Sequence, residues 1–126
     1  MVNEQTVEFG KWERVMQLSV EQSDDVRILR VKEAKLTYPV LSSFFAEVRQ
    51  IVEDGARKLV IDLEEVTYID SAAIGCLMDL YRQATAAGAT LKLAGLRSRV
   101  ETMLTLTGAN QFMEIHPDAA AAVKSF

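Results

Sequence analysis

The segment Leu59–Leu63 constrains the fold more than any other part of this sequence. It is a short apolar run rich in β-branched residues, which is typical of a strand, and its continuous apolar character is expected of a strand covered on both faces. Apolar residues at helical spacing precede and follow it, with short connections between. This alternation favours a parallel sheet with packed helices, because parallel neighbours require a crossover connection.

Three longer segments repeat apolar residues at steps of three and four, which predicts amphipathic helices. Each segment is followed by a glycine, a common helix stop. The helices are expected to begin near Val40, Ser71 and Ser98 and to stop at Gly55, Gly88 and Gly108. A fourth, short helix is expected over Ala119–Val123, with Pro117 in its first turn, where the missing N–H does no harm.

The remaining apolar runs predict strands. Met16–Val20 and Val26–Val31 flank a polar cluster, so they are expected to pair as an antiparallel hairpin. Further strands are expected at Leu59–Leu63, with Glu64–Ile69 as a looser continuation, at Leu91–Ala94 and at Phe112–Ile115. The predicted fold class is α/β: one domain over residues 15–126, with a mixed, mostly parallel sheet, an N-terminal antiparallel hairpin and about four helices.

Residues 1–14 form an extension before this domain. They show no clear periodicity but contain two large apolar residues, Phe9 and the only tryptophan, Trp12. Large aromatic side chains gain most when they leave water, so we expect this segment to dock on another surface.

Charge and composition narrow the function. The 126 residues suffice for one domain, and 14 Lys and Arg against 18 Asp and Glu give a net charge of −4, without a basic surface for nucleic acid or an anionic membrane. No apolar run approaches the roughly 18 residues of a membrane span, and Met1–Gly10 lacks the signal-peptide pattern. The single cysteine, Cys76, is interpreted as a small core residue. We expect a cytoplasmic protein that neither binds nucleic acid directly nor inserts into a membrane.

The dipeptide Asp70-Ser71 stands where a strand leads into a helix. A helix start leaves N–H groups without partners, so a serine there is commonly an N-cap worth about 1 kcal/mol. The same position tolerates a phosphate, which would add about −1.5 to −2 charges beside Asp70 and repel an acidic partner surface. Residue type alone leaves both interpretations of Ser71 open, and Asp70 could equally be a cap or turn residue.

The segment Lys58–Leu77 reads KLVIDLEEVTYIDSAAIGCL. It resembles the signature of STAS domains, in which an apolar strand ending in Asp-Leu leads to an Asp-Ser-Ser-Gly motif at a helix start. Gly88–Gly95 and Val100–Gly108 resemble the family's next strand and helix, so the resemblance covers roughly Met16–Val123. Because several motifs occur in the same order as in the family, the resemblance is far more specific than the Asp-Ser dipeptide alone would be.

The resemblance implies a bacterial anti-sigma factor antagonist, a regulatory protein without cofactor or metal. Such a protein sequesters an anti-sigma factor, often a serine kinase in this family, while its site serine is unphosphorylated, and the sigma factor is released. That serine corresponds to Ser71, and a serine phosphatase and a second copy of the chain are further candidate partners. The residues expected to contact the partner are Thr37, Tyr38, Asp70, Ser71, Ala72, Asp79 and Arg82.

Three positions depart from the family pattern. Ala72 and Ala73 stand where the family has a second Ser and a Gly. The segment Ala34-Lys-Leu-Thr37 stands where the family often has Gly-x-Leu-Asp. A partner protein that recognises these positions would therefore contact a surface different from that of typical family members.

Two other classes of function stay open. The resemblance also admits a scaffold role, as in stressosome-like or transporter-associated STAS domains, which the extension with Phe9 and Trp12 slightly favours. A receiver-like or enzymatic domain has least support, since nucleophile-elbow, P-loop and dinucleotide-binding motifs are lacking. Three carboxylates that might suggest acid–base chemistry are interpreted as solvated strand-end groups: Asp62, Glu64 and Glu65. The one histidine, His116, is interpreted as a loop or helix-start residue. No catalytic residue or metal ligand is predicted.

Overall fold

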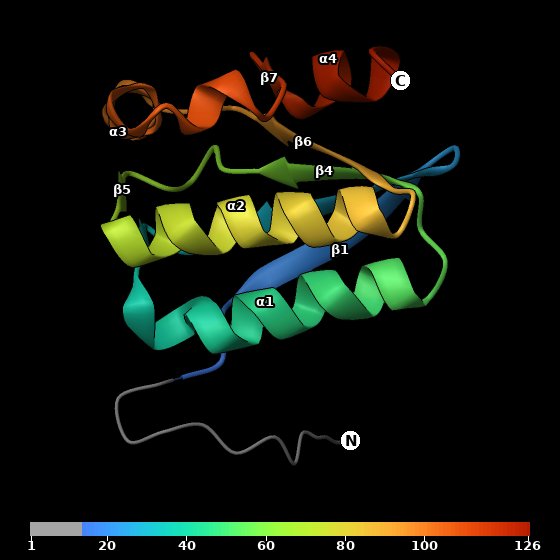
Figure 1. Ribbon diagram of the computed structural model, residues 1–126, viewed down its shortest axis with the longest axis horizontal. Helices are drawn as coiled ribbons and strands as arrows, with labels where there is room; N and C mark the ends of the chain where they lie inside the picture. Colours follow the sequence, from blue (N-terminus) through green and yellow to red (C-terminus); the bar gives the residue numbers. More distant parts are fainter. Residues whose placement is uncertain (1–13) are drawn as a thin grey trace.

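The computed structural model describes residues 14–126 (Figure 1). Residues 1–13, and with them the predicted docking of Phe9 and Trp12, lie outside the described residues. The elements in chain order are β1 Leu18–Ser23, β2 Val26–Val31, β3 Lys35–Leu36, α1 Tyr38–Glu53, β4 Lys58–Asp62, β5 Tyr68–Ile69, α2 Ser71–Ala86, β6 Thr90–Ala94, α3 Ser98–Thr107, the 3₁₀ turn η1 Ala109–Gln111, β7 Ile115–His116 and α4 Ala119–Lys124.

A five-stranded sheet in the order β1-β2-β4-β6-β7 forms the centre of the domain. β1 and β2 pair antiparallel, and the other neighbours are parallel. Helices α1 and α2 lie side by side over one face of the sheet (Figure 1), and α4 packs on the other face. The predicted α/β class, the hairpin, the mixed sheet and the four helices are confirmed.

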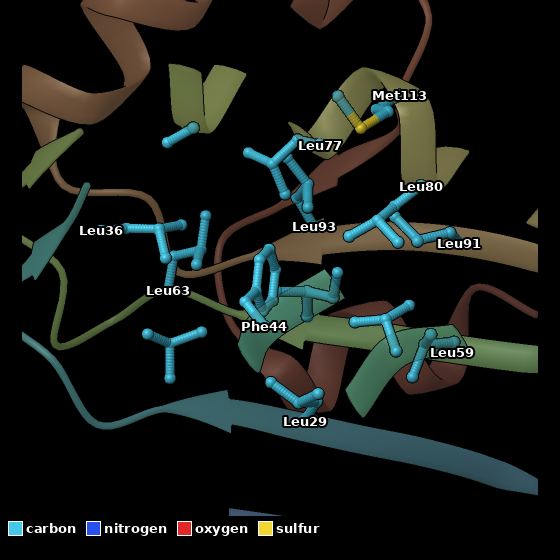
Figure 2. Packing of buried hydrophobic residues seen from close by; sticks show 14 of the residues in the cluster. Leu29, Leu36, Phe44, Leu59, Leu63, Leu77, Leu80, Leu91, Leu93 and Met113 are labelled. Carbon is cyan, nitrogen blue, oxygen red and sulfur yellow. The ribbon is translucent and has the colours of Figure 1, made fainter. Parts of the chain in front are cut away.

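Strand β4 is the middle strand, and its alternate side chains enter two different cores. Leu59 and Ile61 join the large core under α1, α2 and α3, to which Phe44 of α1 contributes (Figure 2). Val60 faces the opposite way, into a smaller core closed by Ala122 of α4. All four of these β4 and α1 side chains are fully buried, so both faces of the strand are covered, as the apolar run predicts.

The strand after β4 differs from the sequence-based expectation. Glu64–Ile69 is not a continuation of β4: the strand ends at Asp62, and β5 instead pairs in parallel with β3 in a separate two-stranded sheet. The turn between them buries Leu63 and Val66, whose side chains hold the chain against the core. Because the turn redirects the chain, β5 arrives beside β3 rather than extending β4.

The ends of β1, β7 and α4 also differ from those expected from the sequence. β1 covers Leu18–Ser23 rather than Met16–Val20, and the hairpin closes through Asp24, which has a positive φ of 54°. The last strand is β7, Ile115–His116, where Phe112–Ile115 was expected, because η1 takes up the residues after α3. Pro117 precedes α4 instead of entering its first turn, since Asp118 is the N-cap and accepts from the N–H of Ala121 at 2.8 Å.

Candidate functional site

Ser71 is the first residue of α2 and is exposed. The interpretation of Ser71 as an N-cap is wrong, because Asp70 takes that position and its Oδ1 accepts from the N–H of Ala73 at 2.8 Å. Within residues 14–126 the Ser71 hydroxyl makes no hydrogen bond. The capping role that the sequence left open for Ser71 therefore belongs to Asp70.

The second oxygen of Asp70 reaches another helix. Oδ2 accepts from the backbone N–H of Tyr38, the first residue of α1, at 3.0 Å. Thr37 is the N-cap residue of α1 by position, but its side chain makes no capping hydrogen bond. One carboxylate thus satisfies N–H groups at the start of both α1 and α2, which would otherwise lack acceptors.

The two-stranded sheet explains why these helix starts meet. Lys35 and Leu36 of β3 pair with Tyr68 and Ile69 of β5, and each strand leads directly into its helix. The N–H groups of Thr67 and Tyr68 both donate to the carbonyl of Ala34, which extends the pairing toward the preceding loop. At two residues each, these strands are too short to show a period of two, so no sequence pattern predicts them.

The remaining residues of the predicted partner surface lie along the outer side of α2. Ala72, Asp79 and Arg82 are exposed, and Arg82 Nη1 lies 2.8 Å from Asp79 Oδ1. Thr37 and Tyr38 join this surface at its start through the contact with Asp70. The structure therefore places all seven predicted contact residues on one side of the molecule.

A groove of about 710 Å³ runs between α1 and α2 beside this surface. Its lining is Leu41, Ser42, Phe45, Ala46, Arg49, Gln50, Glu53, Ala72, Gly75, Cys76 and Asp79. No sequence pattern described above predicts this groove. The signal that could have indicated it is the set of small residues on the outer helix faces, since small side chains leave a depression between neighbouring helices.

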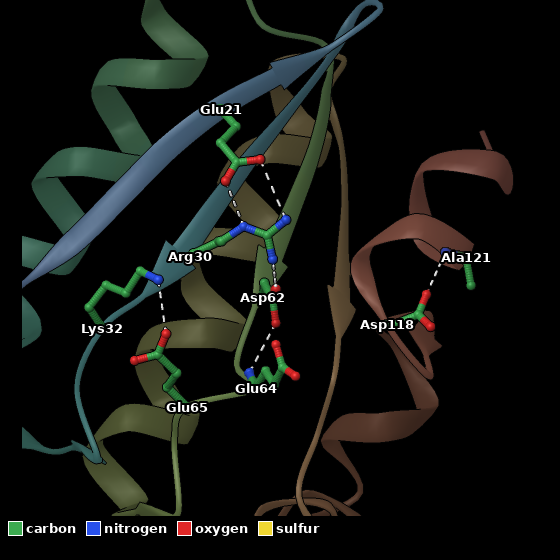
Figure 3. Close-up of polar contacts among 8 residues, drawn as sticks. All are labelled: Glu21, Arg30, Lys32, Asp62, Glu64, Glu65, Asp118 and Ala121. Carbon is green, nitrogen blue, oxygen red and sulfur yellow. Dashed lines mark hydrogen bonds and ion pairs between the residues drawn. The ribbon is translucent and has the colours of Figure 1, made fainter.

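Asp62 is buried, and the prediction that it is solvated at a strand end is wrong. The register places it next to Arg30 of β2, and its Oδ2 pairs with Arg30 Nη1 (Figure 3). The Oδ1 of Asp62 accepts a hydrogen bond from the backbone N–H of Glu64 at 3.0 Å. Arg30 also forms an ion pair with Glu21, in which Arg30 Nε lies 2.8 Å from Glu21 Oε2. Both oxygens of Asp62 are thus engaged, one by Arg30 and the other by the N–H of Glu64.

The family model for the STAS domain matches residues 17–122. The chain belongs to the STAS domain family. It is 25% identical over 105 residues to the anti-sigma-B factor antagonist of Staphylococcus aureus, an alignment that covers 80% of this chain and 94% of that protein.

Solved structures share the fold of this STAS domain. An anti-sigma factor antagonist from Mycobacterium paratuberculosis matches with a TM-score of 0.79 at 19% identity, over 87% of this chain and 92% of that one. The Bacillus cell fate determinant SpoIIAA in its phosphorylated form matches with a TM-score of 0.66 at 14% identity, over 87% and 100%.

Cys76 of the STAS domain lies half-buried on the groove side of α2. Burial, with a smaller contribution from the charge of Asp79, raises the pKa of its thiol to about 12. The thiol is therefore protonated at neutral pH and is a poor nucleophile. This agrees with its interpretation as a small apolar residue.

His116 ends β7, and its Nε2 is hydrogen-bonded to Glu114. Among residues 14–126 no group of three or more His, Cys, Asp or Glu side chains is placed to hold a metal ion. None of the helices described here is long and apolar enough to cross a bilayer.

Proposed function

We propose that this STAS domain is an anti-sigma factor antagonist that acts as a non-enzymatic switch in the cytoplasm. With Ser71 unphosphorylated it binds an anti-sigma factor, and the sigma factor is released; phosphorylation of Ser71 by a serine kinase ends the binding, and a phosphatase restores it. The names of its relatives support the class of function. It acts on transcription through proteins, without direct contact to nucleic acid.

The observation that carries this proposal is the free hydroxyl of Ser71. It is exposed and unbonded within the described chain, whereas Asp70 performs the capping. A kinase can therefore engage the hydroxyl without first breaking a hydrogen bond that stabilises α2. A serine kept only for capping would instead have its oxygen on the N–H of the first turn.

A phosphate at Ser71 would change the charge at the start of α2 more than the conformation of the chain. It adds about −1.5 to −2 charges at the positive end of α2, which tolerates anions. The neighbouring Asp70 already accepts hydrogen bonds from the N–H groups of Tyr38 and Ala73 with its two oxygens. Those two N–H groups are therefore not available to a phosphate on Ser71. The partner surface gains a dense negative patch, which an interface formed around a neutral hydroxyl would have to desolvate.

The two alanines that depart from the family pattern have different consequences. Ala73 is fully buried on the inner face of α2, so the change from the family's glycine acts on packing. Ala72 is exposed beside Ser71, so it is the change that a partner meets. We propose that the partner contacts Ala72 together with Thr37, Tyr38, Asp70, Ser71, Asp79 and Arg82.

Intact mass spectrometry after incubation with candidate anti-sigma kinases and ATP tests the switch. We expect one phosphoryl group on the wild type and none on Ser71→Ala. Ser98→Ala is the matched control, because Ser98 is also an exposed serine at the first position of a helix, α3. Equal phosphorylation of wild type and Ser71→Ala would remove Ser71 from the proposal.

A scaffold role is the second candidate, supported by two exposed apolar side chains away from Ser71. Leu106 at the end of α3 is 77% exposed and Phe112 after η1 is 59% exposed, and such side chains favour self-association. Light scattering across a concentration series tests this: a dimer or larger assembly that Leu106→Ser dissociates would support it, and a monomer throughout would not.

A further inference from the structure

Strand β1 is an open edge of the five-stranded sheet. It pairs with β2 on one side, and no strand of the described chain lies on its other side. The opposite edge strand, β7, has two residues, whereas β1 has six, which pair with β2 without a bulge. β1 contains no proline or lysine. Regular edge strands that lack these protective features are the ones that pair readily with a strand of another chain.

The ladder with β2 fixes which backbone groups of β1 point outward. The N–H of Lys32 donates to the carbonyl of Gln17 at 2.8 Å, so these two opposed residues form a hydrogen-bonded pair. Opposed pairs along an antiparallel ladder alternate between hydrogen-bonded and non-hydrogen-bonded pairs, and residues of the second kind direct their N–H and C=O groups away from the partner strand. Among residues 14–126 these outward groups have no hydrogen-bond partner. In the observed register, the outward residues are Leu18, Val20 and Gln22.

The side chains of β1 suit a further strand at this edge. Val20 is 41% exposed, although it shares a face with Leu18, which packs against the large core. The only charged residue of β1, Glu21, lies on the opposite face, and its carboxylate is paired with Arg30 of β2 (Figure 3). This charge is therefore directed over the sheet, whereas a charge that projects from the edge would discourage pairing.

A second copy of β1 fits this edge in one antiparallel register. With Val20 opposite Val20 of the second copy, Leu18 lies opposite Gln22, so every outward residue enters a pair that exchanges two N–H···O bonds. Ser19 then lies opposite Glu21, and no like charges face each other. A shift by two residues in one direction would set Glu21 opposite Glu21. The same shift in the other direction would leave Gln22 without a partner inside the strand.

We propose that two copies of this chain pair antiparallel through β1, centred on Val20, and so continue one sheet through both domains. The pairing satisfies the outward backbone groups and covers the exposed Val20 side chain with its counterpart. Edge pairing buries less surface than a standard interface, so the dimer dissociates on dilution. The proposal uses neither Ser71 nor the exposed Leu106 of α3, so it stands or falls independently of the proposed function.

Sedimentation equilibrium of the full-length protein across a concentration series measures this dimer. Val20→Pro is the disrupting variant, because it removes an outward N–H and leaves the ladder with β2 intact. Val20→Thr is the matched control, since threonine keeps the N–H and the β-branched side chain. We expect the wild type and Val20→Thr to approach twice the monomer mass as the concentration rises. Val20→Pro should need at least about fivefold more protein for the same dimer fraction, because both bonds of the central pair are lost.

Disulfide cross-linking tests the register and does not depend on whether Val20→Pro folds. Val20→Cys places two thiols opposite each other with about 5.5 Å between the Cα atoms, within the range of a disulfide. Gln22→Cys is the control, because Gln22 is exposed on the same face of the same strand but lies opposite Leu18 of the second copy. We expect mild oxidation to yield covalent dimer several-fold faster from Val20→Cys than from Gln22→Cys or from the wild type, whose only cysteine is Cys76.

A wild type that stays monomeric at every concentration would overturn the proposal. Equal association of the wild type and a folded Val20→Pro would also overturn it, as would a dimer that Leu106→Ser dissociates, since either result assigns the contact to another surface. Equal rates of cross-linking for the two cysteine variants would exclude the antiparallel register centred on Val20.

Discussion

Asp70 of α2 accepts a hydrogen bond from the backbone N–H of Tyr38 at 3.0 Å, although 32 positions separate the two residues. Its other oxygen caps its own helix at Ala73. The junction that carries Ser71 is thus fixed to the start of α1. The position of Ser71 is therefore set by hydrogen bonds at the starts of two helices.

Replacement of Asp70 should cost more stability than replacement of Thr37. Asp70→Ala removes two capping hydrogen bonds, which we expect to lower the free energy of unfolding by about 2 kcal/mol, at about 1 kcal/mol for each cap. Thr37→Ala is the matched control, because Thr37 occupies the N-cap position of α1 without a capping bond. It should change stability by less than about 0.5 kcal/mol. Urea denaturation of both variants measures the difference, and equal losses would contradict the bridging role of Asp70.

Variants of Ser71 should separate binding from stability. Because Ser71 is not the cap, both Ser71→Ala and Ser71→Asp should unfold within about 0.5 kcal/mol of the wild type. Ser71→Ala should keep its affinity for the anti-sigma factor, whereas Ser71→Asp should bind more weakly, because the added carboxylate beside Asp70 must be desolvated. Titration calorimetry gives the affinities and thermal melts give the stabilities. If the Asp and Ala variants bind equally well, Ser71 is not the switch.

Gly95 and Gly88 should respond differently to alanine. Both have a positive φ, 71° and 81°, so each substitution costs about 1–2 kcal/mol of backbone strain. A Cβ on Gly95 would also lie 2.9 Å from Asp62 Oδ1, whereas a Cβ on Gly88 would meet nothing within 4 Å. Displacing the buried Asp62 from Arg30 should make Gly95→Ala the more destabilising by at least about 2 kcal/mol. Denaturant unfolding of the two variants gives this difference, and a smaller gap would show that Asp62 can move away freely.

Glu33 should contribute to the loss of stability in acid. Hydrogen bonds from Arg14, followed by that from the N–H of Gln17, hold the pKa of the Glu33 carboxyl below its ordinary value. A depressed folded-state pKa stabilises the protein above the unfolded-state pKa of roughly 4.3, and this contribution disappears as the pH falls through the lower folded-state value.

Thermal melts between about pH 6 and pH 2 test this contribution across the unfolded-state pKa. Glu33→Gln should lower the melting temperature at about pH 6 and make it fall less steeply below about pH 4 than in the wild type. Glu47→Gln is the control, because the Glu47 carboxylate makes no hydrogen bond within residues 14–126. Parallel acid profiles for wild type and Glu33→Gln would contradict the prediction.

Local patterns in the amino-acid sequence are sufficient to predict the main elements and their order. The apolar run at Leu59–Leu63 and the helical periodicity on both sides of it are local patterns, and burial follows them directly, so β4, α1 and α2 could be predicted. The same holds for the glycine stops, of which Gly108 is in the left-handed conformation that ends α3. The motif around Ser71 likewise indicated the family before any coordinates.

The roles of the polar residues near the strand ends, in contrast, depend on contacts between distant parts of the chain. Asp70 rather than Ser71 caps α2, because backbone geometry at the end of β5 directs that carboxylate toward both Ala73 and Tyr38. Asp62 is buried because the sheet register sets Arg30 beside it. The pairs Asp70–Tyr38 and Asp62–Arg30 each join residues 32 positions apart. The energy of such a contact depends on the distance and direction between its atoms, which cannot be inferred from residue type or from local periodicity.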